Sequence, residues 1–260
     1  MGIDLFYGLN TVRDIRDFRN CLSVLRRIFG RVYASDGLLA VNRNVGFLAD
    51  RRFLSIVQAA AAYSEDEFLK RQAKSKLWRL HLLTWAAALA MRLPGDFVEC
   101  GAFDGFSAFV VAEYTELIHT AKTLYIYDTF AGLSPKYASA NELKKNIFFR
   151  QYPDVLATCR KRFSLYRNVE IIQGVVPETL VTCCPELVSF LHLDMNCADA
   201  ERGALEHVLP RVVTGGLIVL DDYGRRMFRG QKDVADAIMM SHNQQVLELP
   251  TGQGLIIKAS

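Results

Sequence analysis

The segment GDFVECGAFDG, residues 95–105, decides the fold predicted for this chain. A short apolar run at 97–100 is followed at once by glycines at 101 and 105, where a strand can turn tightly into a helix. Further β-rich runs follow along the chain, and helical stretches of ten or more residues separate them. This alternation predicts a parallel sheet covered by helices on both faces. The runs are residues 97–100, 124–127, 169–173, 188–194 and 217–221.

The end of the chain predicts a hairpin. Strands are expected at 246–249 and 254–258, joined by Pro250-Thr251-Gly252-Gln253. A connection this short joins antiparallel neighbours, so the last strand should run against the others. The predicted fold class is therefore α/β, with a Rossmann-like, mostly parallel sheet whose last strand is antiparallel.

The chain before Pro94 has a helical pattern instead. Apolar residues recur at three- and four-residue spacing over 11–29. Asp50 is placed to cap a helix through residue 63, and Ser64-Glu65-Asp66-Glu67 fits a capping box opening a helix to residue 93. We therefore expect a helical N-terminal region, 1–93, and an α/β domain, 94–260.

Composition excludes several classes of protein. Of 260 residues, 51% are hydrophobic and 23% charged, which is typical of a globular protein. Its 31 basic and 28 acidic residues give a net charge of +3, too little to favour nucleic acid. Arginine and histidine interrupt the apolar segment 77–93, so a buried helix is expected rather than a membrane span. Six cysteines without a secretory leader predict a reduced, cytoplasmic protein.

Acidic residues end several of the predicted strands. Glu99 is in the first, Asp128 ends the second, Asp194 the fourth, and Asp221-Asp222 the fifth. In open α/β sheets, ligands bind beyond the carboxyl ends of the strands. The acids are therefore expected where a ligand would lie.

The turn at 101–105 lacks the GxGxxG spacing and has no basic residue for a pyrophosphate. An acid in such a turn favours a ligand with an amine, such as the methionine part of S-adenosylmethionine; a turn needed only for packing is the alternative. Asp128 is placed to accept hydrogen bonds from ribose hydroxyls, or to cap a helix. Gln173-Gly174 could bracket an adenine or form a plain turn.

Asp194, Asp221 and Asp222 are expected on two adjacent strand ends. Three carboxylates there repel one another unless they are protonated or a cation neutralises them. Their oxygen donors suit Mg²⁺, Mn²⁺ or Ca²⁺. A divalent ion could acidify a substrate hydroxyl beside a methyl donor. Solvated loop acids are the alternative. His192 is interpreted as a core histidine rather than a base, and Cys183-Cys184 as buried packing.

Four spaced motifs resemble a known family. They are GDFVECGAFDG (95–105), YIYDTFAG (125–132), FLHLDMN (190–196) and GGLIVLDDYG (215–224). In this order they resemble the metal-dependent O-methyltransferases of the macrocin (TylF) type. The closing LELPTGQGLIIK (247–258) is also similar to class I methyltransferases of that group. The resemblance covers the chain from 94 to its end.

The resemblance implies a seven-stranded class I methyltransferase sheet that binds S-adenosylmethionine. Glu99, Gly101 and Gly105 would line the methionine end, and Asp128 would hold the ribose. Asp194, Asp221 and Asp222 would bind Mg²⁺ or Mn²⁺, and the first 93 residues would form a lid and a substrate or dimer surface. The expected cofactor site also includes Phe103, Ser107, Thr129, Phe130, Gln173, Gly174 and Asp194.

The chain departs from this family at Asn196 and Ala198. Members often have there a second acid, proposed as the general base, and an aromatic residue. Catalysis is assigned to Asp194 and Asn196. Because an amide cannot accept the proton, three explanations of the missing general base remain open. Water takes the proton, another residue such as Asp199 or His192 does, or the substrate differs. Asn196 could itself bind the metal through its carbonyl.

The expected function is Mg²⁺-assisted methyl transfer to a hydroxyl of a sugar, glycoconjugate or other small natural product, by a homodimer without a membrane span. Two alternatives remain. A NAD-dependent oxidoreductase would also have an acid ending its second strand, but the missing GxGxxG argues against it. A non-catalytic protein that binds S-adenosylmethionine would explain Asn196.

Overall fold

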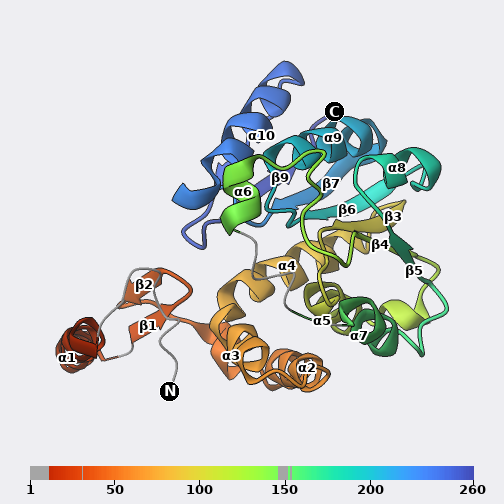
Figure 1. Cartoon of the computed structure of the whole chain (residues 1–260). Coiled ribbons are helices and arrows are strands. Elements are labelled where there is room, and N and C mark those ends of the chain that lie inside the picture. The colour runs from red at the N-terminus through yellow and green to blue at the C-terminus, as the bar shows by residue number, and fades with distance from the viewer. Residues whose placement is uncertain (1–11, 31, 146–151, 153) are drawn as a thin grey trace. The chain divides into compact units, whose positions relative to one another are not determined.

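A computed structural model describes residues 12–30, 32–145, 152 and 154–260 (Figure 1). The chain divides into two compact units, residues 1–81 and 82–260. The first residue of the predicted helix 11–29 lies outside the described residues. The division falls within a helix, twelve residues before the predicted boundary at 93/94, and the role predicted for residues 1–93 stays a prediction.

The first unit contains helices and one small sheet. Asp50 caps α2 as predicted, because its Oδ1 accepts a hydrogen bond of 3.0 Å from the backbone N–H of Phe53. The elements are α1 (Val12–Phe29), β1 (Val32–Ser35), β2 (Leu38–Val41), η1 (Gly46–Ala49), α2 (Arg51–Ala62), α3 (Glu67–Ser75) and the start of α4 (Leu77–Ala90).

Two features of this unit differ from the prediction. Strands β1 and β2 pair antiparallel through Asp36-Gly37, both with positive φ, in a region predicted to be helical. Asp-Gly is a strong hairpin signal that the helical interpretation overlooked. The predicted helix 64–93 is two helices, α3 and α4. The capping box is also wrong: Ser64 Oγ accepts from the N–H of Asp66, and Asp66 Oδ1 accepts from that of Leu69.

The second unit contains a seven-stranded sheet in the order β5-β4-β3-β6-β7-β9-β8. Its first five members are parallel, and β9 runs antiparallel to both neighbours. The predicted fold class is therefore confirmed. The strands are β3 (Asp96–Cys100), β4 (Leu124–Asp128), β5 (Val169–Gln173), β6 (Val188–Leu193), β7 (Val212–Leu220), β8 (Leu247–Glu248) and β9 (Gly254–Ile257).

Helices cover both faces of this sheet (Figure 1): α8, α9 and α10 lie on one face, and α5 and α7 on the other. Alternate residues of each strand point to opposite faces, so Val98 and Leu191 pack in the core with α9 and α10. The helical elements are α5 (Phe106–Tyr114), η2 (Leu117–His119), α6 (Ala140–Lys145), α7 (Val155–Arg162), α8 (Glu178–Thr182), α9 (Ala198–Val208), η4 (Leu209–Arg211), η5 (Arg226–Phe228) and α10 (Arg229–Ser241).

The apolar segment 77–93 forms α4, whose Leu83 and Ala87 are buried while Trp85 is 43% exposed. Within the described part of the chain, no helix has the length and apolarity that a membrane crossing requires. All six cysteines are free thiols. Cys183 is exposed, so the predicted buried packing is wrong for it, whereas Cys184 is partly buried and packs against the core. The reason for the exposure of Cys183 is that it follows the short helix α8 at its end.

Lys122 closes the amino end of the sheet. Its Nζ donates to the carbonyl oxygens of Leu93 and Gly95 and, at 3.2 Å, to Ser189 Oγ. Burial lowers the pKa of this ammonium, with nearby Asp96 opposing the shift. One side chain therefore holds the segment entering β3 against β6.

We expect Lys122→Met to lower the free energy of unfolding of this unit by about 1–3 kcal/mol, because three acceptors lose their donor. Denaturant unfolding measures the change. Lys161→Met, at an exposed position of α7, is the control and should change stability by less than about 0.5 kcal/mol. Equal effects of both variants would contradict the role of Lys122.

Candidate functional site

The carboxyl ends of the central strands bring the predicted site residues to one edge of the sheet. Backbone hydrogen bonds continue the ladder past the strands, from Asp194 N–H to the Cys100 carbonyl and from Asp221 N–H to the Leu193 carbonyl. In the same way, Gly174 N–H donates to the Asp128 carbonyl. The order of the strands reverses between β3 and β6, which is where α/β sheets bind ligands.

At Gly101, the chain that follows β3 lies close to the chain that follows β6. Its φ is +87°, and a Cβ placed there would lie 2.1 Å from the carbonyl oxygen of Asp194. Only glycine fits this approach. The prediction of a tight turn at Gly101 is confirmed, and packing alone already requires the residue.

Asp128 connects the two loops that follow β3 and β4. Its Oδ2 accepts from the N–H of Phe103 at 2.8 Å, and its Oδ1 from the N–H of Phe130 at 2.6 Å. Burial raises the pKa of Asp128, while these two hydrogen bonds act in the opposite direction. An ionised carboxylate has about four acceptor sites. The two loop N–H groups use two of these sites, and Thr129 Oγ1 donates a longer hydrogen bond of 3.5 Å to Oδ1.

The remaining predicted residues near Asp128 have structural partners. Thr129 Oγ1 donates to the carbonyl of Gly132 at 2.6 Å, which shapes the turn after β4. A Cβ at Gly174 would lie 2.5 Å from Thr179 Cγ2, so this glycine lets α8 pack closely. The side chain of Gln173 is exposed.

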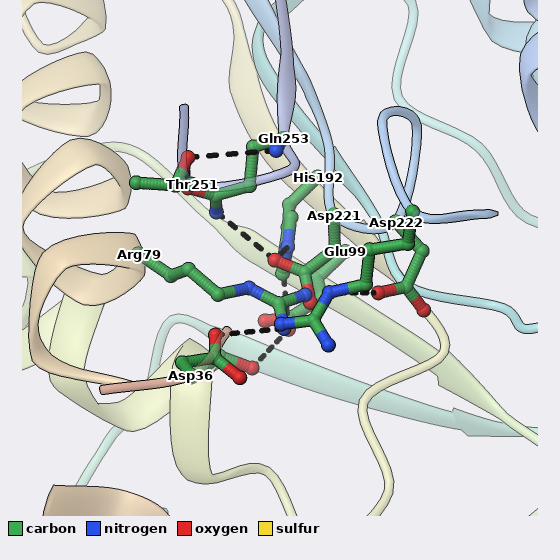
Figure 2. Close-up of polar contacts among 10 residues, drawn as sticks. Asp36, Arg79, Glu99, His192, Asp221, Asp222, Thr251 and Gln253 are labelled. Atoms are coloured by element: carbon green, nitrogen blue, oxygen red, sulfur yellow. Dashed lines mark hydrogen bonds and ion pairs between the residues drawn. The ribbon is translucent and has the colours of Figure 1, made fainter. Parts of the chain in front are cut away.

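A buried histidine joins two of the predicted acids (Figure 2). His192 Nδ1 lies 3.0 Å from Glu99 Oε1, and its Nε2 lies 3.7 Å from Asp221 Oδ1. These residues share one face of the sheet because Glu99 pairs with His192 in register, and Asp221 follows β7 two positions after the partner of His192. Ser107 Oγ also donates to Glu99 Oε1, at 2.5 Å.

His192 compensates the charge of these acids. Burial opposes its protonation, but Glu99 and Asp221 outweigh that effect and raise its pKa to about 10. Its exposed fraction is only 1%. Its burial and its Nδ1 contact fit the interpretation of His192 as a core histidine, but its Nε2 has no hydrogen-bond partner among the described residues, and its role as counter-ion was missed. The available signal was its position two residues before Asp194, on the face that Glu99 shares.

Asp221 and Asp222 have further protein partners. Gln253 Nε2 donates to Asp221 Oδ1 at 3.0 Å, and Thr251 Oγ1 donates to Gln253 Oε1 at 3.0 Å (Figure 2). Arg225 Nε lies 3.3 Å from Asp222 Oδ1. The connection between β8 and β9 therefore packs against the acidic turn, a contact that sequence reasoning did not predict.

Glu201 lies near Asp194, Asp221 and Asp222 as a fourth acid, and sequence reasoning missed it. It lies in α9 and is 3% exposed. Burial raises its pKa well above the ordinary value, and the charges of Asp222, Asp194 and Asp221 raise it further. The signal that could have found it is its position one turn after Cys197, which begins the helix beside Asp194.

The acids at this edge of the sheet have the donor atoms of a metal site but not its geometry. Across residues 12–30, 32–145 and 154–260, no three His, Cys, Asp or Glu side chains converge as metal ligands do. The donor chemistry of the acid cluster, Asp194, Asp221, Asp222 and Glu201, nevertheless suits a hard cation. His192 and Arg225 already neutralise part of its charge.

Asn196 has a left-handed backbone, with φ of +54°, a conformation that asparagine tolerates better than most residues. It leads the chain from Asp194 into α9. Ala198 begins α9, and its N–H donates to Glu142 Oε1 at 2.9 Å. The carboxylate of Glu142 on α6 therefore caps α9.

Solved structures of methyltransferases have the same fold. The O-methyltransferase NovP is 19% identical, with a TM-score of 0.61 over 71% of this chain and 81% of that one. CalS11, a calicheamicin methyltransferase, is 12% identical, with a TM-score of 0.63 over 100% and 98% of the two chains. The sequence model of the macrocin-O-methyltransferase (TylF) family matches residues 74–251. The chain belongs to that family.

Two named relatives have low sequence identity to this chain. The 8-demethyl-8-(2,3-dimethoxy-alpha-L-rhamnosyl)-tetracenomycin-C 4'-O-methyltransferase of Streptomyces olivaceus is 26% identical over 166 residues, 58% of this chain and 64% of that protein. The mycinamicin III 3''-O-methyltransferase of Micromonospora griseorubida is 25% identical over 182 residues, 65% and 72% of the two lengths. The match to the first relative thus spans less than two thirds of its length.

We expect Gly101→Ala to lower the free energy of unfolding by at least about 3 kcal/mol, because two backbone segments must separate. Gly215→Ala is the matched control: its φ is +81°, but the nearest atoms are side-chain carbons of Leu93 at 3.8 Å. That variant should lose only about 1–2 kcal/mol, the strain of the left-handed backbone. Denaturant unfolding of both variants is the measurement, and similar losses would contradict the close approach.

Glu201→Gln should stabilise the protein, increasingly as pH rises. A raised pKa means that the folded state holds a proton that the unfolded state releases above about pH 4.3. Glu201 therefore destabilises the fold progressively from there towards its raised pKa, and glutamine removes this penalty. Melting temperatures at pH 5 and pH 8 in EDTA should differ from wild type by a few degrees more at pH 8. Glu206→Gln, exposed on the same helix, should show no such trend. A difference independent of pH would contradict the prediction.

Proposed function

We propose that this chain is an S-adenosylmethionine-dependent O-methyltransferase acting on a hydroxyl of a sugar attached to a small natural product. Membership of the family supports the reaction, and the names of its relatives support the acceptor class. The observation that carries the proposal is Asp128. It ends β4 and accepts hydrogen bonds from both neighbouring loops and from Thr129, and its carboxylate would use its remaining acceptor capacity for a ligand beside the glycine turn.

In the proposed reaction, the acceptor oxygen attacks the methyl group in line and S-adenosylhomocysteine leaves. Asp128 would hold the ribose hydroxyls. The turn from Gly101 to Gly105 would let the backbone approach the cofactor, and Glu99, fixed by Ser107 and His192, would provide negative charge at the methionine end. Asp194, adjacent to Gly101, would orient the acceptor hydroxyl. The amide of Asn196 cannot accept a proton, so the proton of the acceptor hydroxyl would pass to water.

We also propose that Mg²⁺ or Mn²⁺ binds at Asp194, Asp221 and Asp222. Support comes from their oxygen donors and from their negative charges, which add to the effect of burial in raising the pKa of Glu201. A bound divalent ion would supply positive charge that lowers the pKa of the acceptor hydroxyl. For its ligands to converge, the side chains of the acid cluster would have to rotate from their present partners. Residues 1–93 are proposed to form the acceptor or dimer surface of a cytoplasmic homodimer.

A non-catalytic methyl-donor-binding protein is the second candidate, and Asn196 in place of an acid favours it. Both candidates require methyl-donor binding, whereas only the enzyme transfers the methyl group. Methylation of a panel of nucleotide-activated and product-linked deoxysugars, followed by mass spectrometry, separates them. Transfer to any sugar hydroxyl supports the enzyme. Binding without transfer to any of them supports the second candidate.

We expect S-adenosylmethionine to bind with micromolar affinity. Asp128→Ala should weaken this binding by about 10-fold to 100-fold, because the hydrogen bonds proposed between the ribose hydroxyls and the charged carboxylate are lost. Isothermal titration calorimetry, with and without Mg²⁺, is the measurement. Asp128→Asn should lose less, since its single acceptor oxygen can still bind the N–H of one of the two loops. Asp154→Ala, an exposed position, is the control and should bind like wild type. Binding of NAD without S-adenosylmethionine would contradict the proposal and favour an oxidoreductase.

A further inference from the structure

A buried arginine is hydrogen-bonded to the glycine turn, residues 101–105. Arg162, at the end of α7, is 2% exposed and donates two hydrogen bonds to Asp104. Its Nε bonds the backbone carbonyl at 2.8 Å, and its Nη2 bonds Oδ2 at 2.6 Å. The guanidinium also lies over the ring of Phe106, 5.7 Å from its centre. A charge this deeply buried is stable only when it is paired in this way.

Asp104 links Arg162 to helix α5 as well as to the glycine turn. Its Oδ2 is bonded to Arg162, while its Oδ1 accepts from the N–H of Phe106 at 3.1 Å, in the first turn of α5. One carboxylate therefore ties α7 both to the glycine turn and to the helix that follows it. Because its charge is compensated by Arg162, Asp104 is not the acid that would meet a cofactor amine.

Packing against α7 restrains the same turn. A Cβ at Gly105 would lie 2.8 Å from Cys159 Sγ and 3.1 Å from Phe163 Cε2. Helix α7 lies beside α5 (Figure 1). On the other side of the turn, the N–H of Phe103 donates to Asp128. The three residues 103–105 are thus held between Asp128 and α7.

We propose that Arg162 is a positioning residue for methyl-donor binding, acting through Asp104 on the turn 101–105. This inference rests on the proposed function, because the turn is where the cofactor would bind. The hydrogen bonds from Nε and Nη2 of Arg162 both reach Asp104, the residue between Phe103 and Gly105. They fix the backbone that has to approach the cofactor. Arginine suits this role because its planar fork bonds a carbonyl and a carboxylate together, which lysine cannot do equally well.

The test compares calorimetric affinity for S-adenosylhomocysteine with hydrogen exchange at residues 103–106. Arg162→Met should weaken binding by about 10-fold or more and speed exchange of these amides, and Arg162→Lys should recover part of both. Asp104→Asn should have an intermediate effect. The double variant Arg162→Met/Asp104→Asn should be no worse than Arg162→Met, because the two residues act as one pair.

Lys122→Met is the control for a purely structural loss, because it removes a half-buried side chain that holds the opposite end of the sheet. It should lower stability while leaving affinity and exchange at 103–106 unchanged. If Arg162→Met fails to fold, Arg162→Lys and Asp104→Asn decide the question. Wild-type affinity in these variants, or an equal loss in Lys122→Met, overturns the positioning role. No binding by the wild type overturns the proposed function instead, and the exchange data then report whether Arg162 still holds the turn.

Discussion

The close approach of the chain after β3 to the chain after β6 is the constraint on which the candidate site depends. At Gly101 there is no room for a side chain against the carbonyl of Asp194. Because these two central strands are neighbours, the approach places the glycine turn beside the acid cluster. Arg162 and Asp128 then hold the turn from two sides. A cofactor bound along the turn would therefore meet an acceptor held at the acids.

Negative charge is the second constraint. Four acids, Asp194, Asp221, Asp222 and Glu201, influence one another, and the fold provides His192 and Arg225 as internal counter-ions. Burial makes this compensation necessary, because an isolated carboxylate in the interior is strongly disfavoured. The same charges would attract a divalent cation if the side chains converged. The acid cluster is thus held together by partners that a metal ion would have to replace.

Local patterns were sufficient where one segment determines its own conformation. The five parallel strands, the cap at Asp50 and the turn at Gly101 follow from apolar runs, a capping side chain and glycine. The hairpin at Asp36-Gly37 carried a signal that was outweighed by the helical pattern around it. The break between α3 and α4 was overlooked, although the polar, amphipathic sequence of α3 changes there to the almost wholly apolar sequence of α4.

The order of the elements, the family and the acids that end the strands can all be read from the sequence. Which charges meet depends on the tertiary structure. Arg162 and Asp104 are 58 positions apart, and His192 and Glu99 are 93 apart. No periodicity links such residues, since their contact depends on how the helices and strands pack. For the same reason, the burial that raises the pKa of Glu201 becomes visible only once α9 lies on the sheet.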